Sequence, residues 1–326
     1  MSRLRVAVIY GGRSGEHEIS LKSAESIIAA MDPARYEVQR ILIDKEGHWQ
    51  PRPISPEPDG NPGIDVVFPA LHGTFGEDGT VQGLLELAGL PYVGGGVLSS
   101  AASMDKDVMK RLCRDRGLPI VEFLVLTRGQ FQPEDVCKRL CFPMFVKPAN
   151  LGSSVGISKA HNCEELKAAL DLAGQFDRKI VVERGIDGRE FECAVLGNDQ
   201  PQAAIPCEIL PSREFYDYED KYLLNKAQTV LPADLTPQQT AEMQHLAVEC
   251  YQAVGCEGMA RVDFLMERST GKFFVNEINT VPGFTSISMF PKMWEASGLA
   301  YPALIDRLIE LALERHRERQ ATRFSR

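Results

Sequence analysis

Residues 4–12 read LRVAVIYGG, a run of apolar and β-branched side chains that ends at two glycines. This composition predicts a buried β-strand followed by a tight turn. An apolar pattern that repeats with the period of a helix over positions 19–30 then predicts a helix. Further strands at 38–43 and 64–68 and a helix at 82–88 continue the alternation, which is typical of a parallel sheet covered by helices. We therefore expect a Rossmann-like α/β domain at the amino terminus.

The carboxyl-terminal half has a different pattern and is expected to be α+β. Its predicted strands are joined by short turns, as antiparallel strands are, and lie at 180–183, 191–196 and 203–209. Helices are predicted at 237–254 and 302–315. The basic residues from Arg315 to Arg326 are interpreted as positive charge that completes the last turns of the second helix.

Composition places the chain among ordinary globular proteins. Of its 326 residues, 44% are hydrophobic and 25% are charged, which excludes fibrous and disordered classes. The formal net charge of -9 disfavours a broad nucleic-acid surface and attraction to an anionic membrane. The apolar run from Val6 to Tyr10 is too short for a signal peptide or a membrane span. We therefore expect a cytoplasmic protein that binds neither nucleic acid nor membrane.

The 8 cysteines are scattered along the chain without a CxxC pair. Several lie in apolar stretches, where cysteine behaves as a small hydrophobic residue. A chain of this length can form its core without disulfides, and a reducing compartment fits this cysteine usage. Cys137 and Cys141 are four residues apart on a predicted helix, but no histidine is near them in sequence, so a metal site there is disfavoured.

The segment KPANLGSSVG, residues 147–156, follows a predicted strand and is rich in small residues. Backbone N–H groups and hydroxyls of such a loop can close around phosphates, while Lys147 supplies positive charge. The spacing is not that of a Walker A loop. On this segment alone, a mobile hairpin tip is an equal alternative.

Two predicted strands near the carboxyl terminus, RVDFL at 261–265 and VNEIN at 275–279, contain polar side chains within apolar runs. Glu277 and Asn279 are two residues apart in one strand, so they share a face of the sheet. Together with Asp263 they offer two carboxylates and an amide oxygen, which suit Mg²⁺ bound to nucleotide phosphates better than zinc. The alternative is a buried salt bridge between Asp263 and Arg261.

Two further segments follow strands of the amino-terminal sheet at the edge where open α/β sheets bind ligands. HGTFGEDG, residues 72–79, is predicted to be a site loop, although an isolated histidine in a turn is more often simply solvated. GGRSGEHE, residues 11–18, lacks the glycine spacing of a dinucleotide-binding loop and the HExxH spacing of a zinc site. Elsewhere, YDYEDKY at 216–222 is typical of a lid that excludes water, while its composition alone favours an exposed turn.

Together these segments resemble D-alanine–D-alanine ligases of the ATP-grasp superfamily, and the resemblance extends over essentially the whole chain. HGTFGEDGTVQG, residues 72–83, is similar to the first signature of that family. The run from Val254 through ARVDF to NEINTVPG, which ends at Gly283, is similar to the second. YDYEDKY and PANLGSSVG also look like family segments. Val275 departs from the more usual Leu or Ile, and this conservative change leaves the resemblance intact.

The resemblance implies a Rossmann-like amino-terminal domain, residues 1–104, followed by a two-subdomain ATP-grasp fold at 105–189 and 190–326. It also implies ATP-dependent joining of two D-alanines through a D-alanyl phosphate, for peptidoglycan synthesis. The implied cofactors are ATP and two Mg²⁺ or Mn²⁺ ions, and the implied assembly is a homodimer.

The resemblance further implies residues for each ligand. The metal ions would be held by Asp263, Glu277 and Asn279. ATP would contact Lys106, Lys147, Ser153, Ser154, Glu183, Glu190, Lys221 and Asn279.

The substrates would be bound by a second group of residues. Glu16 would bind the ammonium of the first D-alanine and would be joined by hydrogen bonds to Ser153 and Tyr222. Arg261 and the backbone near Gly283 would stabilise the tetrahedral oxyanion. The remaining implied contacts are Lys221 at the phosphate and lid, His72 at the substrate, and Ser288 at the carboxylate of the second amino acid.

Four alternatives stay open, and one of them is another ATP-grasp carboxylate–amine ligase. A D-alanine–D-lactate ligase would use a hydroxyl nucleophile, but relatives of that kind usually have histidine where this chain has Tyr222. An NAD-dependent protein built on the Rossmann-like half is disfavoured by the missing glycine fingerprint. A non-catalytic ATP-binding regulator would be expected to have lost Asp263, Glu277 or Arg261, and all three are present.

Overall fold

The computed structural model describes residues 3–153, 155–211 and 228–323. Strand β1 (Leu4–Gly11) pairs in parallel with β2 (Tyr36–Ile43) on one side and β4 (Val66–Pro69) on the other, and β3 (Trp49–Gln50) adds an antiparallel edge. Residues Val6 to Ile9 are fully buried, because a central parallel strand is covered on both faces. The Rossmann-like prediction is confirmed.

Helices cover this sheet and lead away from it. They are α1 (His17–Ala30), α2 (Thr80–Leu87), α3 (Val97–Met104) and α4 (Lys106–Asp115). The side chain of Asp105 caps α4 by accepting hydrogen bonds from the backbone N–H groups of Asp107 and Val108, each at 3.1 Å. The cap fixes where α4 begins and therefore the direction in which Lys106 and Lys110 point.

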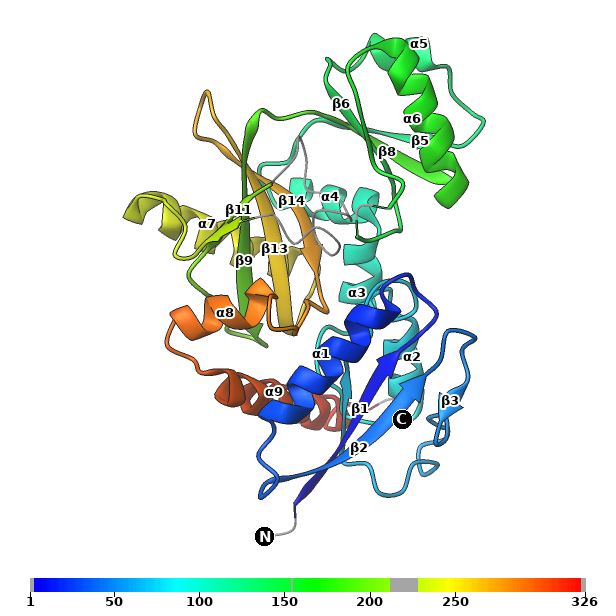
Figure 1. The fold of residues 1–326 in the computed structure, drawn as a ribbon, viewed down its shortest axis with the longest axis vertical. Helices are drawn as coiled ribbons and strands as arrows, with labels where there is room; N and C mark the ends of the chain where they lie inside the picture. The colour runs from blue at the N-terminus through cyan, green and yellow to red at the C-terminus, as the bar shows by residue number, and fades with distance from the viewer. Residues whose placement is uncertain (1–2, 154, 212–227, 324–326) are drawn as a thin grey trace.

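The central sheet is antiparallel, in the order β5-β8-β6-β7. Its strands are β5 (Phe123–Thr127), β6 (Met144–Pro148), β7 (Ser158–Ala160) and β8 (Lys179–Arg184). The short helix α5 (Pro133–Cys137) and the helix α6 (Cys163–Phe176), which was not predicted, pack beside it (Figure 1). The helix expected to contain Cys137 and Cys141 ends at Cys137, so Cys141 lies outside it. Helix α6 begins after Asn162, whose side chain caps it.

The third sheet is also antiparallel, in the order β12-β11-β9-β13-β14, with β10 paired to β9. Its strands are β9 (Gly188–Gly197), β10 (Gln202–Ala203), β11 (Cys207–Leu210), β12 (Gln228–Val230), β13 (Gly258–Glu267) and β14 (Phe273–Asn279). The single strand predicted over 203–209 is wrong, because it is divided into β10 and β11. Pro206 lies between them and cannot donate a ladder hydrogen bond.

Three helices complete the chain: α7 (Pro237–Ala253), α8 (Met289–Ala296) and α9 (Tyr301–Gln320). Figure 1 shows the amino-terminal sheet at one end of the molecule, the central sheet at the other end, and the third sheet between them. Helices α8 and α9 lie below the third sheet and beside α1 (Figure 1). The junction of the three sheets is the place where loops from all of them can meet.

One apolar core is shared between the first sheet and the last helices. Val8 and Phe68 of the sheet belong to the same buried cluster as Leu304 and Leu308 of α9. Because this core crosses the predicted boundaries, the division into 1–104, 105–189 and 190–326 stays a prediction.

Arg315 corrects one part of the interpretation of the basic carboxyl-terminal end, whereas Arg317 and Arg319 lie in the last turn of the helix as interpreted. Helix α9 continues to Gln320, and Arg315 is only 4% exposed. Its Nη1 donates to the carbonyl of Gly94 at 2.5 Å and its Nη2 to the carbonyl of Tyr92 at 2.7 Å. Arg315 therefore joins α9 to the amino-terminal domain and is not charge at the helix end.

The structure also joins Cys137 and Cys163 by a disulfide, with their Cα atoms 6.5 Å apart. The sequence required no disulfide, and this pairing was not predicted. Cys137 ends α5 and Cys163 begins α6, so residues that are 26 apart in sequence meet only when the two helices pack together.

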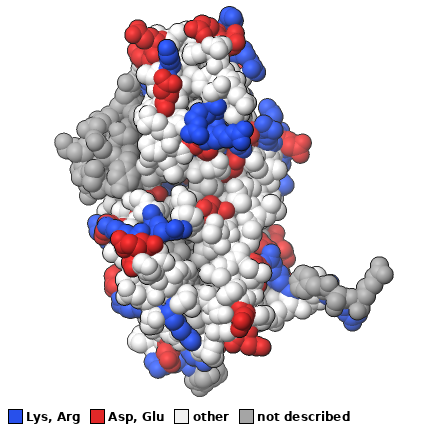
Figure 2. Space-filling model, turned by 90° about the vertical axis from the view of Figure 1, so that its right-hand side faces the viewer, with Lys and Arg blue, Asp and Glu red and all other residues white. Residues whose placement is uncertain are grey.

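Two observations bear on the expected absence of nucleic-acid and membrane partners. In the face shown in Figure 2, most basic side chains lie beside acidic ones. Among the residues that the structure describes, no helix has both the length and the apolar composition needed to cross a membrane.

Candidate functional site

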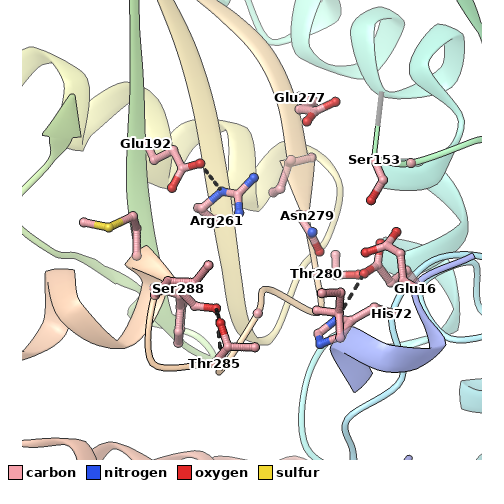
Figure 3. A pocket seen from close by; sticks show the side chains of 18 of the residues that line it. Glu16, His72, Ser153, Glu192, Arg261, Glu277, Asn279, Thr280, Thr285 and Ser288 are labelled. Atoms are coloured by element: carbon pink, nitrogen blue, oxygen red, sulfur yellow. Dashed lines mark hydrogen bonds and ion pairs between the residues drawn. The ribbon is translucent and has the colours of Figure 1, made fainter. Parts of the chain in front are cut away.

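A cavity of about 390 Å³ lies where the three sheets meet. In the view of Figure 3, Glu16, His72 and Ser153 gather on one side and Arg261 and Glu192 on the other. Strand β14 contributes Glu277 and Asn279 between the two groups (Figure 3). Other predicted residues that line the cavity are Lys106, Gly283 and Ser288.

Strand register explains the acidic side of the cavity. Asp263 of β13 lies opposite Glu192 of β9 and opposite Glu277 of β14. Arg261 is two residues before Asp263, so all these side chains share one face of the sheet. Arg261 Nε donates to Asp263 Oδ1 and Nη2 to Oδ2, both at 2.7 Å, and Nε lies 3.3 Å from Glu192 Oε1. Two carboxylates therefore contact one guanidinium, and Glu277 lies opposite Asp263 in the neighbouring strand.

The salt bridge that the sequence left as an alternative is present. Burial raises the pKa of Asp263 to about 7, although Arg261 favours the ionised carboxylate. Asp263 faces Arg261, whereas Glu277 and Asn279 line the cavity. Within the described ranges, no cluster of three His, Cys, Asp or Glu residues forms a ready-made metal cage. The metal assignment of Asp263, Glu277 and Asn279 stays a prediction.

The opposite side of the cavity is basic. Lys106 of α4 lines the cavity and donates through Nζ to the carbonyl of Leu151 at 2.7 Å. Behind it, the Nζ atoms of Lys147 and Lys110 lie 2.9 Å and 3.1 Å from the carboxylate of Glu183. Burial opposes ionisation of Glu183, but the two lysines outweigh it and lower the pKa of Glu183 to about 2. Two lysines therefore share one carboxylate, and Lys106 lies nearer the cavity.

His72 is held in a fixed orientation. Its ring is buried, with Nε2 2.8 Å from Ser23 Oγ and Nδ1 3.2 Å from the carbonyl of Val281. Burial disfavours a charged ring, but Glu77, at 3.5 Å, raises the pKa of His72 above its ordinary value. These contacts exclude a merely solvated turn residue.

Glu16 reaches the cavity from the residue that precedes α1, and the adjacent loops leave room for its carboxylate. A Cβ on Gly152 would lie 3.6 Å from Glu16 Oε1, and one on Gly73 would lie 3.1 Å from it. Ser153, next to Gly152, has a φ of 53°, a conformation that residues other than glycine adopt mainly where the surrounding structure imposes it. The loop at 152–153 thus approaches Glu16 closely, as the implied Glu16–Ser153 contact requires.

Ser288 precedes α8 and is fixed by its neighbours. Its Oγ accepts a hydrogen bond from the Thr285 N–H at 3.0 Å and lies 2.9 Å from Thr285 Oγ1. A Cβ on Gly283 would lie only 2.6 Å from Ser288 Oγ. Glycine at 283 therefore permits the position of this hydroxyl.

Gly283→Ala is expected to raise the apparent KM for the substrate that Ser288 is predicted to contact by about tenfold, because the hydroxyl of Ser288 must leave its hydrogen bonds with Thr285. Steady-state kinetics would measure the change. Gly83→Ala is the control, since a Cβ there meets nothing within 4 Å and no kinetic change is expected. An unchanged KM in Gly283→Ala would mean that Ser288 does not contact substrate.

The remaining predicted residues fall into two groups. Lys147, Glu183, Glu190 and Asp263 are not among the residues that line the cavity. Ser154, Lys221 and Tyr222 lie outside the described residues, so the lid assignment stays a prediction.

Two residues that sequence reasoning missed are Glu192 and Lys110. Glu192 is recognisable only through the register of β9 with β13. Lys110 is four residues after Lys106, and this spacing places both on one helix face, but the spacing does not reveal Glu183 as its partner.

Comparison with known proteins gives consistent matches over the chain. Residues 5–62 and 55–95 match the family described as D-ala D-ala ligase N-terminus, and residues 112–310 match D-ala D-ala ligase C-terminus. A D-alanine--D-alanine ligase of Solibacter usitatus is 66% identical over 324 residues, covering 99% of this chain and 100% of the relative. D-alanine--D-alanine ligase A of Escherichia coli K12 is 46% identical, with 97% of both chains covered.

Solved structures agree with these relatives. The D-alanine-D-alanine ligase of Coxiella burnetii has a TM-score of 0.87 and 40% identity, with 98% of this chain and 97% of that chain covered. The VanG D-Ala:D-Ser ligase of Enterococcus faecalis also has a TM-score of 0.87, with 35% identity and coverage of 95% and 100%.

Proposed function

This chain belongs to the family of D-alanine–D-alanine ligases, and from that premise we propose how its cavity joins two D-alanine molecules with ATP. The enzyme is an ATP-dependent ligase that makes D-alanyl-D-alanine for cell-wall synthesis. The observation that best supports the proposed site is its charge distribution. Lys106 lines the cavity together with the carboxylates of Glu192 and Glu277, while Lys110 and Lys147 pair with Glu183 and Arg261 pairs with Asp263 and Glu192.

Such a site suits a polyanion that carries bound cations. Lys110 and Lys147 share the carboxylate of Glu183, and Lys106 lines the cavity, where its Nζ donates to the carbonyl of Leu151, so positive charge is available to phosphate on this side. The carboxylates exceed the single guanidinium of Arg261, so the other side favours a cation. ATP with a divalent metal meets both requirements.

The donor set fits Mg²⁺ or Mn²⁺. Glu277 and Asn279 present oxygen atoms to the cavity, and Asp263 lies directly opposite Glu277 in the sheet. We propose that these three residues hold two metal ions, which would neutralise charge on the transferring phosphoryl group. No histidine or cysteine is needed for such a site.

The proposed reaction has two steps. An oxygen of the first D-alanine carboxylate attacks the γ-phosphorus of ATP, the bond to the β–γ bridging oxygen breaks, and ADP leaves. The amine of the second D-alanine then attacks the carbonyl carbon of the D-alanyl phosphate, loses a proton, and displaces phosphate. Glu16 would hold the ammonium of the first D-alanine, and Lys106 and Lys147 would neutralise the phosphates.

Arg261 is proposed to stabilise the tetrahedral oxyanion of the second step, together with the backbone near Gly283. Asp263 holds the guanidinium through two parallel hydrogen bonds, which fixes its plane before the reaction begins. Both Arg261 and Gly283 line the same cavity. A preoriented donor of this kind stabilises developing charge without reorganising.

A coupled assay of ADP and phosphate release tests the proposal. D-Alanine with Mg²⁺ should give both products and the dipeptide, whereas L-alanine should give neither. Added D-lactate tests the alternative: a preference for the ester product would identify a D-alanine–D-lactate ligase. Absence of ADP release with D-alanine would reject the ligase function.

Asn279→Ala should raise the half-saturating Mg²⁺ concentration and lower kcat, each by about tenfold or more, because one oxygen ligand is lost. Asn279 Oδ1 also accepts a hydrogen bond from the Val281 N–H at 2.9 Å, so Asn279→Asp is the matched variant that retains an oxygen there. Titration of activity with MgCl₂ after chelation would measure both variants. An Asn279→Ala enzyme with unaltered Mg²⁺ dependence would remove Asn279 from the metal site.

We also propose that the enzyme acts in the cytoplasm as a homodimer, without nucleic-acid or membrane partners. Its use of ATP and its net charge of -9 support the location and the absence of those partners. Family resemblance supports the dimer, which light scattering of the purified protein would test.

A further inference from the structure

Lys110 is a fully buried lysine that takes part in neither step of the proposed reaction. It projects from α4 and is 0% exposed. Its Nζ lies 3.1 Å from Glu183 Oε1 and 3.4 Å from the carbonyl oxygen of Asn276. An ammonium group is costly to bury and is retained when it is paired and hydrogen-bonded. Lys110 therefore requires an anionic partner at this position, and Glu183 is that partner.

The two oxygens of Glu183 are divided between two lysines. Oε1 faces Lys110 and Oε2 faces Lys147, whose Nζ lies 2.9 Å away. The Nζ of Lys147 is also 3.3 Å from Asn276 Oδ1. Glu183 is only 2% exposed, so water cannot substitute for either lysine. This buried chain of charges fixes where the ammonium of Lys147 lies.

The strands hold this arrangement from both sides. Glu183 lies on β8 opposite Phe123 of β5 and opposite Phe145 of β6. The Nζ of Lys110 is 6.0 Å from the ring centre of Phe123, and the Nζ of Lys147 is 6.0 Å from that of Phe145. Each lysine thus has one aromatic ring and one oxygen of Glu183 beside it. Loss of one lysine would leave Glu183 to pair with the other alone.

We infer that Lys110 is a positioning residue for nucleotide binding, which holds Glu183 so that Lys147 and Glu183 present a fixed surface to ATP. This inference rests on the proposed function, in which Lys147 and Glu183 belong to the ATP site. Without Lys110, both oxygens of Glu183 become available to Lys147. The stronger pairing would offset the charge that Lys147 offers to phosphate.

A purely structural role makes a different prediction. Burial lowers the pKa of Lys110, while Glu183 acts against this effect. A group that only fills space could be replaced by an apolar side chain of similar length without altering nucleotide affinity. A positioning residue cannot be replaced in this way, because its charge sets the orientation of Glu183.

The test compares Lys110→Met with wild type. Lys110→Met should raise KM for ATP and the Kd for ADP by about tenfold or more, while the KM for D-alanine stays within about threefold. It should also change the ratio of activity with ATP to activity with GTP, because the orientation of Glu183 is altered. Lys138→Met is the control and should match wild type, because Lys138 is an exposed lysine just after α5 that pairs with Asp135 at the surface.

A double-mutant comparison connects Lys110 to Glu183. Adding Lys110→Met to Glu183→Gln should raise KM for ATP much less than adding it to wild type, because the carboxylate that Lys110 positions is already neutral. If Lys110→Met does not fold, Lys110→Gln is measured in the same series.

Two results would overturn the inference: an unchanged KM for ATP in the folded Lys110 variants, or equal effects of the substitution with and without Glu183. Wild-type ligation is measured first in the same assay. Absence of wild-type ligation would reject the proposed function, whereas normal wild-type ligation with unchanged variants would reject only the role of Lys110.

Discussion

Arg261→Lys is expected to lower kcat for dipeptide formation by roughly 10²–10³-fold, the usual loss when one oxyanion donor is removed. The guanidinium of Arg261 binds both oxygens of Asp263 and still has N–H groups left to donate. A lysine ammonium is a point charge without this planar fork. It can pair with Asp263 or reach the oxyanion, but it cannot hold both in the same geometry.

Lysine is preferable to alanine at this position because it keeps a positive charge beside Asp263 and Glu192. Removing the charge would leave these buried carboxylates without a partner and could unfold the protein. Arg268→Lys is the matched control, since Arg268 forms an exposed ion pair with Asp187. Single-turnover measurement of dipeptide formation would separate chemistry from product release. A rate within threefold of wild type would show that Arg261 does not meet the oxyanion.

The amino-terminal fold could be predicted because its signal is local. The buried run in β1 and the glycines that follow it specify a strand and a turn regardless of distant contacts. Helix α6 was not predicted, although Asn162 caps it and its buried residues Leu166, Ala169, Leu170 and Ala173 recur at helical spacing. The apolar composition of residues 203–209 predicts one continuous strand. Pro206 interrupts the pairing of the backbone, so the segment forms the two strands β10 and β11.

The site was predictable where polar residues interrupt apolar strands. Asp263, Glu277 and Asn279 could be identified from spacing, and the structure brings Glu277 and Asn279 to one cavity. Tertiary pairing was not predictable. The partnership of Lys110 with Glu183 joins residues of α4 and β8, and only the packed fold shows it.

The contacts of Arg315 with the amino-terminal domain are likewise visible only in the packed fold. They predict a large effect on stability. Arg315→Ala should lower the free energy of unfolding by about 3 kcal/mol, because the carbonyl groups of Tyr92 and Gly94 lose buried charged donors. The guanidinium also lies 4.4 Å from the ring centre of Tyr92, so packing is lost as well as hydrogen bonding. In thermal unfolding of a chain of this length, this corresponds to a fall in Tm of roughly 4 °C.

Arg307→Ala on the same helix is the control. Arg307 pairs with Glu310 and Glu314 at the surface, and such pairs contribute at most about 1 kcal/mol. Calorimetry of both variants would measure the difference, and limited proteolysis would show whether α9 separates first. If Arg315 only completed the last turns of the helix, both substitutions would have the same small effect. A large loss confined to Arg315→Ala would show that this side chain attaches the last helix to the amino-terminal domain through the carbonyl groups of Tyr92 and Gly94.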